Sequence, residues 1–160
     1  MPLSDLGWLA QQIVKIEQPV HVETVFERLK TGLGIPRLSS NVRMRLASAL
    51  RETVDNGGVV RVPDRFLRLA LGGLDVRPRC DGSSGITRVS DAELDVGLLA
   101  VARATFGVER ADLVRMTARQ FGYGHTGANI AARLEQRVDD LLEVGRPSEQ
   151  SGTLVAIQLD

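Results

Sequence analysis

The chain contains an internal repeat: its two halves match without a gap when one is shifted by 88 residues. Apolar residues and turn glycines coincide along the match. The matched pairs include Leu6 with Leu94, Val20 with Val108, Gly34 with Gly122, Leu46 with Leu134, Gly57 with Gly145 and Leu69 with Ile157. A repeat of this length exceeds a solenoid unit and is long enough for one small domain. The sequence therefore predicts copy one at 1–70, a linker at 71–90 and copy two at 91–160.

Copy one contains three segments with apolar residues at helical spacing. Ser4 is the expected N-cap of the first helix, and Ser39, Ser40 and Asn41 are all competent to cap the third. A very short strand at 20–22 separates the first two helices. Two runs of strand-forming residues, 59–62 and 65–69, flank a Pro-Asp turn and predict a hairpin. The predicted fold class is mainly α with small β-hairpins, in the order of a tandem winged-helix (helix-turn-helix) repeat.

Copy two repeats this pattern with helices predicted at 91–105, 110–120 and 127–144. Its hairpin, or wing, is expected to be degenerate. Residues 147–150 are poor strand formers, whereas 153–159 are good ones. We therefore expect one strand of the second hairpin to be short or missing.

Charge is distributed unevenly, although the formal net charge is zero. Residues 36–80 carry nine Arg against four acidic residues, a net of +5, whereas residues 81–160 carry a net of −4. Arg suits forked contacts to phosphate or carboxylate groups. An Arg-rich chain also follows from genome composition alone, so both explanations stay open at this stage.

The third helix of copy one is the main functional candidate. The face opposite the apolar stripe centred on Leu46, with its flanks, the preceding turn and the wing, carries the candidate DNA-binding residues Arg37, Ser40, Asn41, Arg43, Met44, Ser48, Arg51, Arg61, Arg65 and Arg68. Winged helices present such a helix to base edges, with Arg at its rim and in the wing for phosphates. The alternative is a solvated helix face without a ligand.

The same face of copy two is acidic. It carries Asp139, with Glu135 and Asp140 nearby, and carboxylates repel a phosphate backbone. Copy two is therefore expected to pack against or bind a partner. Because Arg45 and Arg133 are equivalent in the two copies, we favour a structural role for both. Reversing the charge of Arg137 in copy two is expected to matter little for DNA binding.

No catalytic or cofactor site emerges from the sequence. The Gly-rich segment 122–127 lacks both the Gly-Lys-Ser/Thr ending and the preceding strand of a phosphate loop. With one cysteine, Cys80, and two distant histidines, no zinc-ligand spacing exists. We expect no enzyme activity, no cofactor and no metal; a deep polar pocket would revive an enzymatic interpretation. The single cysteine and the absence of a signal or membrane-spanning segment predict a cytoplasmic location without membrane contact.

Segment 13–25, Ile-Val-Lys-Ile-Glu-Gln-Pro-Val-His-Val-Glu-Thr-Val, is similar to a known family. It resembles a domain of unknown function at the C-terminus of large bacterial superfamily 1 helicase-like proteins that also carry a Vsr-like restriction-type endonuclease domain. The resemblance continues through segment 33–42 and more weakly through 120–127. It implies an accessory module of a DNA-processing protein whose ATPase and nuclease lie outside this chain. The family pattern favours Arg before the third helix, where copy two has His125.

Together these observations predict a non-catalytic DNA-binding accessory module of a helicase- or nuclease-type protein. The expected partner is duplex DNA, bound weakly and largely without sequence preference, with another domain or protein as a further partner of copy two. The alternative is a protein–protein interaction or dimerisation module built from paired winged helices. A DNA-binding surface requires Arg37, Arg43, Arg51, Arg61 and Arg65 to lie on one continuous face.

Overall fold

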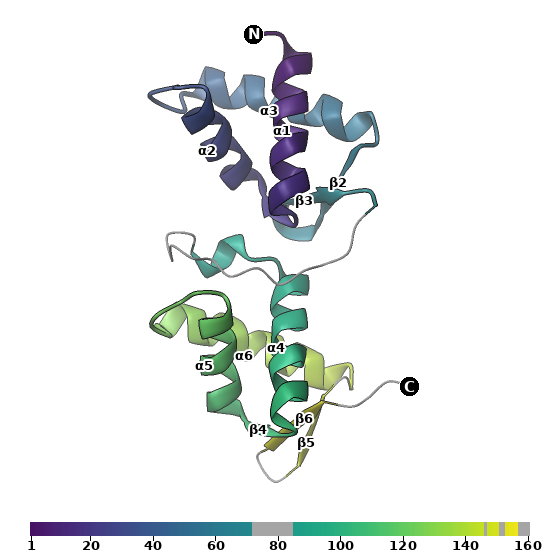
Figure 1. Ribbon diagram of the computed structural model, residues 1–160, viewed down its shortest axis with the longest axis vertical. Helices are drawn as coiled ribbons and strands as arrows, with labels where there is room; N and C mark the ends of the chain where they lie inside the picture. The colour runs from purple at the N-terminus through teal and green to yellow at the C-terminus, as the bar shows by residue number, and fades with distance from the viewer. Residues whose placement is uncertain (72–84, 146, 151–152, 157–160) are drawn as a thin grey trace. The chain divides into compact units, whose positions relative to one another are not determined.

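A computed structural model of the chain describes residues 1–71, 85–145, 147–150 and 153–156, with side chains up to residue 145 (Figure 1). The chain divides into two compact units, unit 1 at Met1–Gly73 and unit 2 at Leu74–Asp160. Unit 1 holds copy one and unit 2 holds copy two. The described part of each unit is mainly helical, with a small antiparallel sheet.

Unit 1 consists of three helices, a two-residue strand and a hairpin. The elements are α1 (Leu3–Glu17), β1 (Val20–His21), α2 (Val22–Gly32), α3 (Ser40–Asp55), β2 (Val59–Val62), the 3-10 turn η1 (Pro63–Arg65) and β3 (Phe66–Leu69). The sheet order is β1-β3-β2, and all pairs are antiparallel. The predicted hairpin and short strand are confirmed by this pairing.

Local chemistry explains where these elements begin and end. The Ser39 hydroxyl accepts a hydrogen bond from the Val42 amide at 3.4 Å and caps α3. The expected cap Ser4 is wrong, because α1 begins two residues earlier than such a cap implies, with Pro2 at the N-cap position, and the Ser4 hydroxyl donates to Asp5 instead. Asp64 and Arg65 adopt positive φ angles of 59° and 64° in the turn that reverses the hairpin.

Apolar faces of all three helices close over the sheet to form the core of unit 1. Leu46, at the centre of α3, is 2% exposed, which confirms the predicted helical phase. Helix α1 packs across α3 (Figure 1). A Cβ atom at Gly7 would lie 2.7 Å from the Thr53 hydroxyl, so a glycine is required for this close approach.

Unit 2 repeats the same order of elements. They are the 3-10 turn η2 (Ile86–Arg88), α4 (Asp91–Thr105), β4 (Val108–Glu109), α5 (Arg110–Gln120), α6 (Ala128–Glu143), β5 (Pro147–Gln150) and β6 (Thr153–Ala156). The sheet order β4-β6-β5 matches that of unit 1. Each of these elements from α4 to β5 lies 88 residues after its counterpart, and the predicted helices at 91–105 and 110–120 are confirmed.

The second hairpin corrects two expectations. Both β5 and β6 form four-residue strands, so no strand is missing. Strand β5 is an edge strand that begins at a proline, a position where the missing amide is tolerated. Two residues separate the last paired residues of this hairpin, whereas three separate them in unit 1. The residue that pairs with Val108, as Leu67 pairs with Val20, is therefore Leu154 and not residue 155, which lies 88 residues after Leu67. The ungapped match to Ile157 therefore fails in the last strand.

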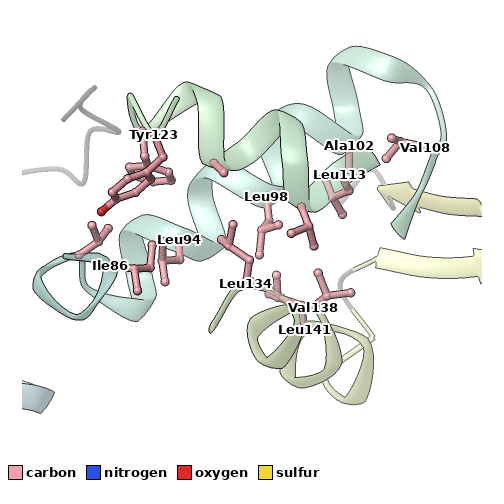
Figure 2. Packing of buried hydrophobic residues seen from close by; sticks show 14 residues of the cluster. Ile86, Leu94, Leu98, Ala102, Val108, Leu113, Tyr123, Leu134, Val138 and Leu141 are labelled. Carbon is pink, nitrogen blue, oxygen red and sulfur yellow. The ribbon is translucent and has the colours of Figure 1, made fainter. Parts of the chain in front are cut away.

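Buried side chains of α4, α5 and α6 meet in the centre of unit 2, and Leu134 is fully buried as predicted (Figure 2). Ile86 and Val89, in the segment predicted to be a linker, belong to this core. Ile86 lies near Tyr123 (Figure 2), and because both Ile86 and Val89 are buried in this core, the folded part of unit 2 begins before residue 91. Residues 72–84 of the predicted linker lie outside the described residues.

Candidate nucleic-acid interface

The ten residues predicted to contact DNA occupy three places in unit 1. Arg37 lies in the connection between α2 and α3, and five residues plus Arg51 lie along α3. The remaining three belong to the hairpin and its turn. Nine of the ten side chains are exposed, and Met44 is an apolar example at 63%. The exception is Arg68, which is half-buried and donates a long hydrogen bond to the Leu69 carbonyl at 3.5 Å.

Glu23, in the first turn of α2, joins two of the predicted arginines. Its carboxylate accepts a hydrogen bond from Arg43 of α3 at 2.6 Å and another from Arg65 of the hairpin turn at 3.2 Å. The hydrogen bond from Arg43 is the main cause that holds the pKa of Glu23 below its usual value. This carboxylate fixes the hairpin turn relative to α3 and neutralises one of the two positive charges.

Three other predicted arginines have no carboxylate partner among the described residues. Arg37, Arg51 and Arg61 are exposed, and none of the described residues forms an ion pair with them. Exposed guanidinium groups of this kind are available to phosphate oxygens. They are the strongest candidates for backbone contacts in unit 1.

The hairpin presents its arginines on opposite faces. Arg61 pairs with Leu67 across the strands, whereas Arg68 pairs with Val60. Directly opposed residues share a face and neighbours along a strand alternate, so Arg61 lies on the face that contains the core residue Leu67 and Arg68 on the other. The ten predicted residues therefore do not all lie on one continuous face.

The equivalent face of unit 2 differs in charge. The residues corresponding to Ser40, Asn41, Met44, Ser48 and Arg51 are Ala128, Asn129, Ala132, Gln136 and Asp139, and all five are exposed. Asp139 pairs with Arg110 at 2.6 Å. Arg110 itself is the counterpart of apolar Val22. A carboxylate therefore stands in unit 2 where unit 1 presents an unpaired guanidinium.

Arg137 is a structural residue of unit 2, and the expectation that reversing its charge matters little for DNA binding stays a prediction. Its side chain is 17% exposed and forms two hydrogen bonds of 2.8 Å to Asp95 of α4. It also contacts Asp140 at 2.5 Å and Asp91 at 3.6 Å. The hydrogen bond to Asp95 is the main cause that raises the pKa of Arg137 above its usual value. An acidic residue in place of Arg137 would put a fourth carboxylate among those of Asp91, Asp95 and Asp140 and would destabilise unit 2.

The equivalent residues Arg45 and Arg133 both tie the third helix of their unit to the start of the first. Arg133 pairs with Asp91 at 2.6 Å, and Arg45 donates to the Met1 carbonyl oxygen. These contacts agree with the structural role favoured for them. Glu23 is not among the predicted site residues, and its one signal in the sequence is that copy two has Ala111 in the equivalent position.

The histidines have different surroundings. His21 caps α2 by accepting a hydrogen bond from the Glu23 amide at 3.2 Å, and its ring lies edge-on to Phe66. His125 is exposed. Cys80 lies outside the described residues.

The described residues hold no group of three or more His, Cys, Asp or Glu side chains that could bind a metal ion. None of their helices is long and apolar enough to cross a membrane. Comparison with known proteins finds no match to a family model, to a curated protein or to a solved structure.

Proposed function

We propose that the protein is a tandem winged-helix module and that unit 1 binds duplex DNA without catalysing a reaction on it. Support comes from the order of elements: helix, short strand, two helices and a hairpin, with the short strand paired to the hairpin. Winged-helix proteins have this order, and they place the third helix in the major groove.

One observation carries the assignment of DNA binding to unit 1. Arg37, Arg51 and Arg61 are exposed without a carboxylate partner among the described residues, whereas unit 2 has Asp139 in place of Arg51. Duplex DNA presents a dense row of negative charges, so unpaired guanidinium groups favour unit 1 over unit 2.

Binding is weak and largely independent of sequence in this proposal. The exposed face of α3 offers few side chains for a paired contact to a base edge, namely Asn41 and its arginines, and its last turn carries the carboxylate of Asp55. About 3–5 phosphate contacts give a log K that falls with log salt at a slope near −3 to −4. The proposed module acts beside the motor or nuclease of a helicase-type protein, in line with the resemblance in segment 13–25.

Unit 2 has a different role. Glu135, Asp139 and Glu143 are exposed on α6, and this acidic surface favours a protein partner over DNA. An interaction module built from paired winged helices is therefore the second candidate function.

The proposal is tested by the fluorescence anisotropy of labelled duplex DNA. The DNA is titrated with the full chain at several salt concentrations from about 20 mM to 150 mM. We expect the Arg51→Glu/Arg61→Glu variant to bind at least about tenfold more weakly at low salt, since two phosphate contacts are reversed in sign. Arg103→Glu/Arg119→Glu is the matched control, with the same change of charge at exposed positions of unit 2. Absence of binding at low salt, or equal weakening by both variants, would transfer the assignment to the interaction module.

A further inference from the structure

Unit 1 has an open pocket of about 260 Å³ between α1 and α3. Its lining includes Trp8 and Gln11 from α1 and Ala49, Glu52 and Asn56 from α3 or its C-cap. None of the ten residues of the candidate DNA interface belongs to it. The pocket therefore requires its own explanation.

The repeat shows what fills the equivalent place in unit 2. Arg137 is the counterpart of Ala49, and its guanidinium group lies between α4 and α6. The three carboxylates that hold it, Asp91, Asp95 and Asp140, are the counterparts of Leu3, Gly7 and Glu52. All three of those unit 1 residues line the pocket, as does Ala49. Unit 2 thus carries an arginine of its own where unit 1 has Ala49 in a close helix contact, with an open pocket beside it.

One of the three carboxylates is kept in unit 1. Glu52 is exposed and forms no ion pair with any described residue. Beside it, the Trp8 ring is 60% exposed, a large apolar surface left in water. Tryptophan is the best aromatic partner for a cation placed over its face, and a guanidinium group can also stack on it. Glu52 supplies charge, Trp8 supplies a planar surface, and the amides of Gln11 and Asn56 supply carbonyl acceptors.

We infer that this pocket binds the guanidinium group of an arginine side chain presented by a partner protein. The partner's arginine enters from the open side of the pocket, with its charge on Glu52, the counterpart of Asp140, and its plane against Trp8. A lysine ammonium fits less well, because it is a compact, strongly hydrated charge without a planar fork. This binding site is independent of the proposed contact with DNA.

Trp8 is the only tryptophan of the chain, so intrinsic fluorescence reports on this pocket alone. The experiment titrates the full chain with N-acetyl-arginine N-methylamide, with the citrulline analogue as a neutral match of the same shape and the lysine analogue as a second cation. We expect a saturable change of Trp8 emission with a Kd of about 1–20 mM for arginine, as befits one side chain. Citrulline and lysine should bind at least about fivefold more weakly.

Variants of α3 separate the pocket from general electrostatics. Glu52→Gln should weaken arginine binding about tenfold, because it removes the only charge in the pocket lining. Asp55→Asn, an equal change of charge at an exposed position of the same helix outside the pocket, should leave binding unchanged. The inference is overturned if arginine gives no saturable change, if citrulline or lysine equals arginine, or if Glu52→Gln binds as the wild type does.

Discussion

Units 1 and 2 have the same order of elements but place their charges differently. In unit 2, Arg137 lies inside the contact between the first and third helices, and Asp139 faces outward. In unit 1, Ala49 occupies the inner position and Arg51 the outer one. The same fold therefore uses arginine as an internal clamp in one unit and leaves it on the surface in the other. Where an arginine lies relative to the helix contact decides whether it supports the fold or remains available to a ligand.

The carboxylates differ in the same way. Unit 1 holds Arg43 and Arg65 with a single carboxylate, Glu23, so the group keeps a net positive charge. Unit 2 surrounds Arg137 with three carboxylates, so that group is net negative. Local charge, and not the neutral total, distinguishes the surfaces of the two units.

The largest expected effects are in the two cores. Leu46→Ala and Leu134→Ala should each lower the free energy of unfolding of their own unit by about 2–5 kcal/mol, because both residues are fully packed. Urea unfolding measures this, with Trp8 fluorescence reporting unit 1 and circular dichroism reporting both units. A loss well under about 1 kcal/mol at both positions would show that the third helices are not packed as described.

Arg137→Gln should destabilise unit 2 by about 2 kcal/mol, because it leaves the carboxylates of Asp95 and Asp140 facing each other without a cation. Unit 1, followed by Trp8 fluorescence in the same urea titration, should be unaffected. Arg119→Gln, at an exposed position of unit 2, is the control. Equal stability of the Arg137 variant and the control would mean that the cluster contributes nothing to the fold.

The helices could be predicted from the sequence and most charged contacts could not. Helices depend on residues a few positions apart, whereas the charged contacts join residues far apart along the chain. Helix bounds at 91–105 and 110–120 follow from local spacing and from the repeat. Glu23 contacts Arg65 across 42 residues, and Arg137 contacts Asp95 across the same separation. Propensity carries no information on such pairs. The repeat did hold a signal, since Gly7 and Ala49 in one copy correspond to Asp95 and Arg137 in the other.

Strand propensity also misled the prediction of the second hairpin. The sequence Pro-Ser-Glu-Gln at 147–150 is unfavourable for a strand, yet it pairs along its full length with β6. Backbone hydrogen bonding to an existing strand determines the conformation of this edge, and propensity is a weak prior there. The second hairpin loop is one residue shorter than the first. The sequence did not reveal this, because residues 154–157 are all apolar and match the first hairpin at an offset of either 87 or 88 residues.

Glu23→Gln tests the clamp between α3 and the hairpin through DNA affinity. The substitution removes a negative charge beside Arg43 and Arg65, so we expect binding to duplex DNA at low salt to tighten about threefold. Glu109→Gln, an exposed carboxylate of unit 2, should leave the affinity unchanged. Weaker binding by Glu23→Gln would mean that holding the hairpin in place matters more than the charge.

The smallest expected effect is on the pH dependence of stability. Because the pKa of Glu23 is held below its usual value in the folded state, its contribution to stability is present above the unfolded pKa of about 4.3 and is lost as the pH falls through the folded pKa. The wild type should therefore lose more stability in unit 1 than Glu23→Gln between about pH 5 and pH 3. Trp8 fluorescence in urea at several pH values measures the difference, and identical pH profiles would contradict it.

The division of roles between the two units is tested most directly by NMR of the ¹⁵N-labelled full chain titrated with duplex DNA at low salt. We predict amide shifts concentrated in α3 and the hairpin of unit 1, around Ser48, Arg51 and Arg61, with their counterparts on α6 and β5 unchanged. Shifts concentrated on α6 around Gln136 and Asp139, or spread equally over both units, would contradict it.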